Sequence, residues 1–387
     1  MDVEGTKQLY RELSSIPGKK LGPYTLVEGK EGKRVVELQN RVDKVVSDTD
    51  PSQRVLRVPS PWHAAVLLHE LVRESIQLEK KSNPRIDRFA TVLRRRPRFV
   101  FRGQSDARRD LVPKIRREGV NRLNEETALG NFYTLMPTVL GGFLDVNQLS
   151  AKATAQHYGI ATDFLDFTLD PEVATYFAAS GQKSEDGQEA VVYVLPLSNA
   201  FEAGARLIFP PPLVERLYAQ WGLFMESPVP DELRRACVAE VRFTPDSSFA
   251  VIREGKEVDL IGERDGWITR LADLARRHNE SLNEYSVKEQ IGGLPFREVD
   301  RRFLTREWLI RTLGVLYWVA ITRYEQSEII DTEVLELVAR DNLHVLKSLL
   351  REYDSAGALE FDPERQDSED MKRFASVLRK AIRKIEG

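Results

Sequence analysis

One stretch in the middle of the chain constrains the fold more than any other. Residues 165–171 alternate apolar and polar side chains, which predicts a strand. Residues 172–179 have a polar start and an apolar body, which predicts a helix that docks against a sheet. Residues 190–195 follow as a continuous apolar run, the clearest buried strand in the sequence. The central third of the chain is therefore predicted to be mixed α and β.

Further strands and helices are expected around this unit. Residues 20–58 hold short alternating segments between Gly- and Lys-rich turns, and residues 24–27 and 34–38 are interpreted as strands. The other expected strands are residues 98–102 and 238–243, and the other expected helices are residues 64–78, 125–140 and 152–158. The last of these helices stops before Gly159, where a left-handed C-cap forms easily.

From Trp267 onward the strand patterns fade and amphipathic helices dominate. The longest is expected over residues 332–352, and a charged helix over residues 368–385 closes the sequence. We therefore predict an α+β protein in three parts, which are a β-rich N-terminal segment (1–58), a mixed central domain (59–245) and a C-terminal helical region (246–387).

Composition limits the partners. The chain has 57 Lys and Arg against 60 Asp and Glu, a net charge of −3, so nothing draws it as a whole toward double-stranded DNA or an anionic membrane. Its one cysteine, Cys237, is expected to be a buried thiol in a reducing compartment. The sequence shows neither a signal-peptide pattern nor a long apolar run. We expect a cytoplasmic protein with no membrane partner.

Arg102 is the first candidate for a ligand-binding residue. It stands where an expected strand ends, and Gly103 after it permits close approach of the backbone. A guanidinium placed in this way can hold a phosphate or a carboxylate through two hydrogen bonds. The alternative is an arginine exposed to solvent or half of an ion pair.

A second group of candidates lies in residues 162–168. Strand alternation puts Asp166 and Thr168 on one face and apolar side chains on the other. A carboxylate among core residues needs a partner, and Arg102 is the obvious one. A structural ion pair between two strands and a catalytic role for Asp166 both remain open.

His157 and Tyr158 stand together before a glycine and a loop. Their rings are suited to stacking on a planar ligand or hydrogen-bonding to it. Because no second His, Cys or carboxylate follows at ligand spacing, we expect no metal at His157.

Gln220 and Glu226 flank an aromatic turn that contains a glycine. Either could place a polar group over a ring-lined pocket, whereas Trp221, Leu223 and Phe224 are interpreted as core. The common phosphate-loop, dinucleotide-fold and serine-hydrolase motifs are absent from the sequence.

A basic run leads into the Arg102 segment. It begins at residues 94–98 and continues through Arg108, Arg109, Lys114, Arg116 and Arg117. Such a run is usually a solvated face, but it can also steer a phosphate-bearing ligand or a nucleic acid.

These motifs resemble the FRG domain, a bacterial module named for an aromatic-Arg-Gly motif. The resemblance runs from about residue 58 to residue 243, through residues 101–104, 156–168, 173–179 and 219–224. The family commonly shows Pro-Thr-Arg-Leu-Leu-Asp-Trp-Thr where residues 161–168 read Ala-Thr-Asp-Phe-Leu-Asp-Phe-Thr, so Asp163 replaces an arginine.

The order of the motifs is also similar to that of the ADP-ribosyltransferases, including the RNA 2′-phosphotransferases of that superfamily. This resemblance implies a split sheet with flanking helices, Arg102 on the pyrophosphate of NAD, and Gln220 or Glu226 in place of the catalytic glutamate. The implied NAD-binding residues are Arg102, Gly103, Gln104, His157, Tyr158, Thr168 and Tyr176, and the implied catalytic residues are Arg102, His157, Asp166, Gln220 and Glu226.

The resemblance implies an FRG protein that binds NAD as a substrate and cleaves it or transfers its ADP-ribose to a protein or RNA, as a bacterial toxin or a phage-defence effector. A second possibility is a non-enzymatic sensor of a nucleotide or an RNA end that signals through the C-terminal helices. A third is a metal-dependent nuclease with Asp163, Asp166 and Asp170 as ligands.

Overall fold

The fold is known from a computed structural model. It describes residues 1–15, 19–21, 24–26, 33–47, 53–82, 99–140, 148–181, 187–209, 215–226, 229–253, 255–262, 266–277, 332–343, 345–347, 350–351 and 366–387. The basic run at residues 94–98 lies outside these ranges.

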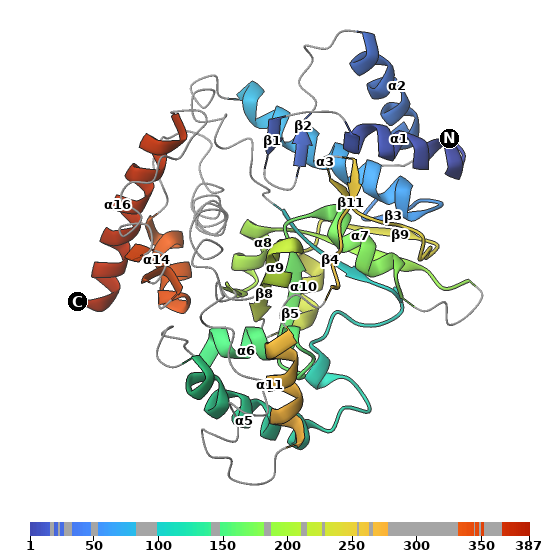
Figure 1. Ribbon diagram of the computed structural model, residues 1–387. Coiled ribbons are helices and arrows are strands. Elements are labelled where there is room, and N and C mark those ends of the chain that lie inside the picture. Colours follow the sequence, from blue (N-terminus) through green and yellow to red (C-terminus); the bar gives the residue numbers. More distant parts are fainter. Residues whose placement is uncertain are drawn as a thin grey trace.

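A seven-stranded mixed sheet forms the centre of the molecule (Figure 1). Its order is β3 (Val55–Arg57), β9 (Ala239–Phe243), β6 (Ala190–Pro196), β4 (Phe99–Gln104), β5 (Phe164–Thr168), β8 (Gly222–Glu226) and β7 (Arg206–Ile208). Only β3 and β9 are parallel, and the other neighbours are antiparallel. The strands predicted around residues 98–102, 165–171, 190–195 and 238–243 are confirmed.

The sheet splits between β4 and β5. Strand β4 pairs with β6 over its whole length, but within these two fully described strands a single pair, Phe101 and Thr168, joins β4 to β5. Beyond Phe101 the two backbones no longer bond to each other. A gap therefore opens beside Arg102, Gly103 and Asp166.

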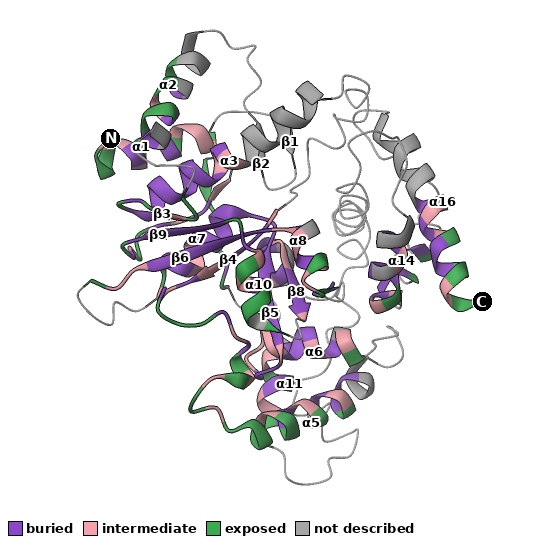
Figure 2. Ribbon diagram, turned by 180° about the vertical axis from the view of Figure 1, so that it is seen from behind, coloured by how far each residue is buried: buried purple, intermediate pink, exposed green. Residues whose placement is uncertain are grey.

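Alternating side chains of the strands build two cores. In β6, Val191, Tyr193 and Leu195 belong to one apolar cluster, whereas Val192 and Val194 belong to the other. The strands are accordingly buried on both faces (Figure 2). This explains why residues 190–195 read as a continuous apolar run rather than an alternating one.

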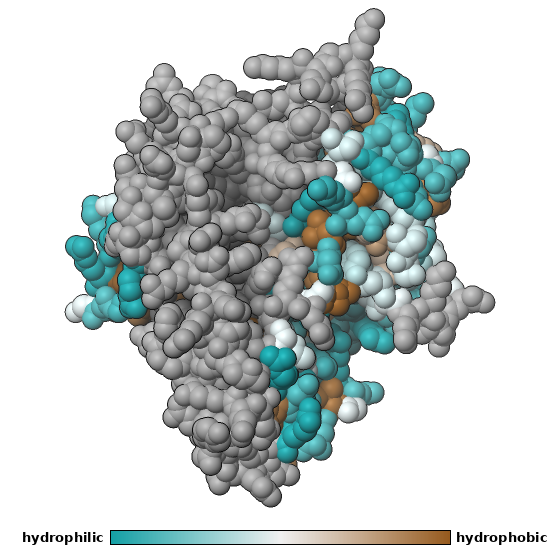
Figure 3. Space-filling view, in the orientation of Figure 1, coloured by the Kyte–Doolittle hydropathy of each residue, from teal (hydrophilic) through white to brown (hydrophobic). Residues whose placement is uncertain are grey.

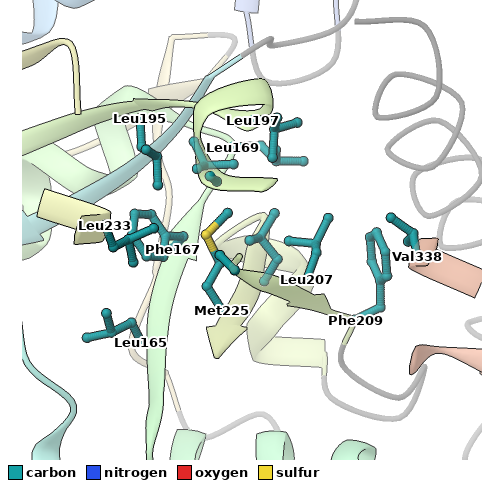
Figure 4. Packing of buried hydrophobic residues seen from close by; sticks show 14 of the residues in the cluster. Leu165, Phe167, Leu169, Leu195, Leu197, Leu207, Phe209, Met225, Leu233 and Val338 are labelled. Atoms are coloured by element: carbon teal, nitrogen blue, oxygen red, sulfur yellow. The ribbon is translucent and has the colours of Figure 1, made fainter. Parts of the chain in front are cut away.

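The helices cover both faces. One face carries α1 (Val3–Ser15), α3 (Pro61–Ser82) and α7 (Pro171–Ala179), and the other carries α8 (Leu197–Glu202), α10 (Pro230–Ala236), α14 (Thr332–Asp341) and α16 (Gln366–Glu386). Figure 4 shows Val338 of α14 beside Phe209, next to Leu207 and Met225 of the sheet edge. A third cluster joins α5 (Arg122–Leu140), α6 (Gln148–His157) and α11 (Gly266–Arg277) to Phe164 and Phe224.

The remaining short elements are β1 (Lys19–Leu21), β2 (Tyr24–Leu26), η2 (Lys114–Arg116), α9 (Glu215–Ala219), β10 (Ile252–Arg253) and β11 (Lys256–Glu257).

Helix α7 begins where the sequence predicts it. Asp170 caps it by accepting hydrogen bonds from the amides of Glu172 at 2.8 Å and Val173 at 3.3 Å, and Pro171 occupies the first turn. The predicted left-handed Gly159 after α6 is also confirmed, with φ of +96°. The expected helices at residues 64–78 and 125–140 correspond to α3 and α5.

The strand prediction for residues 34–38 is wrong. These residues lie in helix α2 (Lys33–Ser47), and α1 adds a second helix to a segment expected to be β-rich. Over the longer window, Leu38, Val42 and Val45 recur at helical spacing and are buried. A window of five residues is too short to distinguish the two-residue period of a strand from the 3.6-residue period of a helix.

The predicted C-terminal helices are present in the described residues, with one changed boundary. Helix α16 matches the prediction for residues 368–385. The helix predicted over residues 332–352 is interrupted, because α14 ends at Asp341 and the described residues 343, 345–347 and 350–351 are helical again after a turn at Asn342. The buried Asn342 donates to the carbonyl of Leu207 at 2.7 Å and accepts from the amide of Phe209 at 2.8 Å. These bonds hold the end of α14 on the edge of the sheet. Among the described helices, none has the length and apolar character needed to span a membrane.

A buried polar network fixes α7 to the N-terminal helices. Glu172 accepts a hydrogen bond from the Tyr10 hydroxyl at 2.9 Å and also contacts the imidazole of His69. Asp170 pairs with Arg253 at 2.9 Å. Since α7 packs on β4, this network sets the position of α7 beside the split in the sheet.

Replacing Gly103 with alanine should destabilise the protein. A Cβ there would stand 1.8 Å from the carbonyl oxygen of Ala174, where only a shift of helix or strand could make room. We expect Gly103→Ala to lower the free energy of unfolding by about 3 kcal/mol or more in urea titrations. The control is Gly130→Ala in α5, where a Cβ meets no atom within 4 Å and should stabilise the protein by up to about 1 kcal/mol. Equal effects of the two changes would contradict this packing.

The stability of the protein should fall on the alkaline side because of His69. Burial opposes its protonation, but the charge and the hydrogen bond of Glu172 outweigh burial and raise the pKa of His69. A raised histidine pKa contributes stability that is complete below the unfolded value and is lost as the pH rises through the folded value. As the pH rises above about 6.5, the ordinary histidine pKa, the free energy of unfolding should therefore decline more in the wild type than in His69→Gln. Parallel pH profiles would show that the pair contributes nothing.

Candidate functional site

A pocket of about 280 Å³ lies at the split between β4 and β5. It brings together six of the residues predicted for the site, which are Arg102, Gly103, His157, Asp166, Thr168 and Gln220. Its other lining residues are Phe101, Gln156, Phe167, Val173, Ala174, Phe177, Arg216, Leu217, Gly222, Leu223 and Phe224. Segments far apart in the sequence therefore form one site with apolar walls and a few polar groups.

Arg102 and Asp166 form the expected pair across the split. The Arg102 Nη1 donates to the backbone carbonyl of Asp166 at 2.6 Å and lies 3.6 Å from its carboxylate. The Arg102 side chain is 12% exposed, but that of Asp166 is 56% exposed, so the expectation of a core carboxylate is wrong. Asp166 also accepts from Gln156 Nε2 at 2.6 Å. Its carboxylate is thus held in place and still open to a ligand.

Thr168 connects the strand to the turn that carries Gln220. Its hydroxyl donates to the Gln220 carbonyl at 2.6 Å and accepts from the Asp170 amide at 3.0 Å. The buried Gln220 side chain donates to the Leu260 carbonyl at 2.7 Å, which fixes its amide. Trp221, next in the chain, has a φ of +48°, a strained backbone conformation for an aromatic residue. The strain occurs directly at the pocket.

His157 is a neutral group at physiological pH. Burial and the nearby Arg216 lower the pKa of His157 to about 4, although the charge of Asp166 opposes this. Its buried Nε2 has no hydrogen-bond partner within the described part of the chain. It can therefore offer a hydrogen bond to a ligand without adding positive charge.

Cations surround the carboxylate of Asp166. Arg102 and Arg216 line the pocket, and Arg117 lies near them. Burial and the charges of Arg102 and Arg109 lower the pKa of Arg117, whereas the charge of Asp166 raises it. A site with more cations than carboxylates favours an anionic ligand. The sequence reading missed Arg216 and Gln156, because nothing local distinguishes a pocket residue from an exposed one.

Four predicted residues do not line this pocket. Tyr158 stands edge-on to the His157 ring at 5.4 Å, and Tyr176 packs in the same way on Phe177 at 5.5 Å. Gln104 donates to the carbonyls of Asp106 at 2.9 Å and Arg109 at 2.7 Å.

Glu226 is the fourth. It lies 2.7 Å from Arg206 and 3.5 Å from Lys152, at the far end of β8 from Gly222. Arg206 also binds Asp341 of α14 at 2.6 Å. The carboxylate of Glu226 thus belongs to an ion network that attaches the C-terminal helices.

The three aspartates of the nuclease hypothesis have separate partners. Asp163 pairs with Lys152, Asp166 with Arg102, and Asp170 with Arg253 at the cap of α7. Among the residues whose placement is described, no group of three or more His, Cys, Asp or Glu could hold a metal ion. Cys237 is buried, and burial raises the pKa of its thiol to about 12, so it is no nucleophile at neutral pH.

These features define a mixed α+β protein with a basic, apolar-walled pocket at a split in its sheet. The model of the FRG domain matches residues 97–187, so the chain carries an FRG domain. The match includes Arg102, His157 and Asp166 and stops before Arg216 and Gln220. Neither the curated proteins nor the solved structures gave a significant match to the chain.

The acidity of His157 can be measured directly. In an NMR titration its imidazole should protonate with an apparent pKa of about 4, below that of an exposed histidine. In Arg216→Gln the pKa should rise, because one opposing charge is gone, yet stay depressed by burial. A wild-type pKa near the ordinary value of about 6.5 would contradict the buried environment.

Proposed function

We propose that this pocket binds NAD and that the protein cleaves it or transfers its ADP-ribose. The observation that carries the proposal is the convergence of Arg102, Asp166 and the neutral His157 on one apolar-walled pocket. Ligand pockets commonly measure roughly 300–1,000 Å³. At about 280 Å³ this one suits the nicotinamide, its ribose and the adjoining phosphate, with the adenosine end outside.

The chemistry of the lining residues fits such a ligand. Arg102 and Arg216 would hold the phosphates, and half-buried Phe177 offers apolar surface for the nicotinamide ring. That ring carries a positive charge in NAD, which a protonated histidine would repel. The low pKa of His157 avoids this repulsion.

Asp166 is the carboxylate suited to the reaction. Cleavage breaks the bond between the ribose carbon and the nicotinamide nitrogen, and both electrons stay on that nitrogen, which makes nicotinamide neutral. An oxygen or nitrogen lone pair of water or an acceptor forms the new bond and releases its proton to solvent. Asp166 can stabilise the positive charge that develops on the ribose, while Arg102 and Arg216 hold the phosphates and so keep the reacting atoms in place.

A second candidate function is a sensor that binds the nucleotide without cleaving it. Two observations favour it. The turn places an amide, Gln220, at the pocket, and the carboxylate of Glu226 is neutralised by Lys152 and Arg206. In this case the ion network between β8 and α14 would carry the signal to the C-terminal helices.

Incubation with NAD and detection of nicotinamide by mass spectrometry distinguish the two candidates. We expect nicotinamide release, with Arg102→Gln and Asp166→Asn each slower by roughly 100-fold. The matched control is Arg57→Gln, which removes an exposed pair with Glu189 on edge strand β3 and should keep the wild-type rate. A cell in which the wild type consumes NAD should also stop growing, as expected of a toxin or a phage-defence effector.

Other outcomes decide against one or both candidates. NAD binding in calorimetry without nicotinamide release would favour the sensor. Neither binding nor release at millimolar NAD would contradict both. If Glu226→Gln abolished release while Asp166→Asn did not, the assignment of the reactive carboxylate to Asp166 would be wrong.

A further inference from the structure

A group of cations lies near the pocket, around the turn that follows His157. Residues 107–122 contain six basic and two acidic side chains, although the whole chain has a net charge of −3. Lys114 and Arg116, on η2, are exposed, and Arg117 is half-buried. The carboxyl end of α11 adds exposed Arg276 and Arg277. We call these five residues the basic rim.

Three contacts place the basic rim beside the pocket. Lys114 Nζ donates to the carbonyl of Gly159 at 3.1 Å, two residues beyond His157. The guanidinium of Arg276 reaches the same glycine, because a Cβ on Gly159 would meet its Nη2 at 2.7 Å. The amide of Ile115 donates to the Thr162 carbonyl at 3.4 Å, which anchors η2 on the turn between α6 and β5.

Structural roles explain only part of this charge. Lys114 and Arg276 meet the carboxyl end of α6, where a cation is favourable. The carboxylate of Asp273 partly neutralises the guanidinium groups of Arg276 and Arg277, which lie 3.7 Å and 4.0 Å from it. Within the described ranges, however, no carboxylate pairs with exposed Arg116, and the guanidinium of Arg117 donates only to the Val112 carbonyl. The rim keeps an excess of positive charge that the fold does not use.

The surface near the rim is suited to phosphates rather than to an apolar partner. In Figure 1 the segment between β4 and α5 runs down beside α11, and in Figure 3 the coloured residues at the lower right are mostly hydrophilic, with a few apolar ones among them. Spaced arginines match a chain of phosphates. The ring of His157, which lines the pocket, offers a surface against which an unpaired base can pack.

We propose that the basic rim binds the backbone of a single-stranded RNA whose end reaches the pocket as the acceptor of ADP-ribose. This inference rests on the proposed function, since it names the acceptor for that reaction. A duplex cannot bring its atoms into a pocket of about 280 Å³ beside Asp166, whereas an unpaired end can. Strand ends carry the hydroxyl or phosphate oxygen that the transfer requires.

Binding is tested without NAD, with a fluorescein-labelled single-stranded oligouridylate and a hairpin of the same length. Fluorescence anisotropy at several salt concentrations should show preference for the single strand. The logarithm of the binding constant should fall with the logarithm of salt by about 0.7 for each phosphate contact. In the double variant Arg116→Glu, Arg277→Glu we expect at least a tenfold loss of affinity and a slope smaller by about 1.4.

The control is Lys380→Glu, an exposed charge reversal on α16, far from the rim in Figure 1. Circular dichroism melts establish that each variant is folded. Three outcomes would overturn the proposal. The rim variant could bind the single strand as tightly as the control does, or the wild type could bind the hairpin as tightly as the single strand. The protein could also transfer ADP-ribose to a protein at a rate that the rim variant leaves unchanged. Rim-dependent RNA binding without NAD cleavage would overturn the proposed function, and with it the role of the RNA as acceptor, but not the binding of RNA to the rim. NAD cleavage without RNA binding would overturn the rim alone.

Discussion

The site depends on the single bridge between Phe101 and Thr168. Had β4 and β5 paired along their whole length, backbone hydrogen bonds would fill the space in which Arg102 reaches the carbonyl and carboxylate of Asp166. Because the strands part, side chains and helices α6 and α7 must line the gap. The close contact of Gly103 with the backbone of α7 keeps one wall in place. A defect in strand pairing thus becomes a pocket.

Electrostatics then determine what this pocket can hold. Arg102 and Arg216 are partly withdrawn from water, where their charges act more strongly than on an open surface. Asp166 offsets one of them and stays half exposed, whereas His157 is kept neutral. The same low polarity that suppresses the charge on His157 would strengthen the attraction of a phosphate to the two arginines. The proposed anion binding and the neutral imidazole would share one physical cause.

Local patterns predict what depends on local order. The strands β4, β5 and β6, the cap of α7 and the shared neighbourhood of Arg102 and Asp166 follow from alternation, a buried run and an N-cap aspartate. Helix α2 was misread because five residues cannot separate a period of two from one of 3.6. The partners of Glu226 could not be predicted, since Lys152, Arg206 and Asp341 come together only in the tertiary structure. Arg216 lies in a pocket for the same reason.

The left-handed turn at Trp221 has a mechanical consequence. Its backbone conformation sends two neighbouring residues in opposite directions, so Gln220 lies in the pocket while Trp221 packs against the cluster that contains α14 and α16. An aromatic residue keeps such a conformation, at a cost of roughly 1–2 kcal/mol, only because its surroundings hold it. One peptide unit therefore separates the polar groups of the pocket from the hydrophobic cluster beneath the C-terminal helices. A movement of Trp221 in that cluster would displace Gln220 in the pocket.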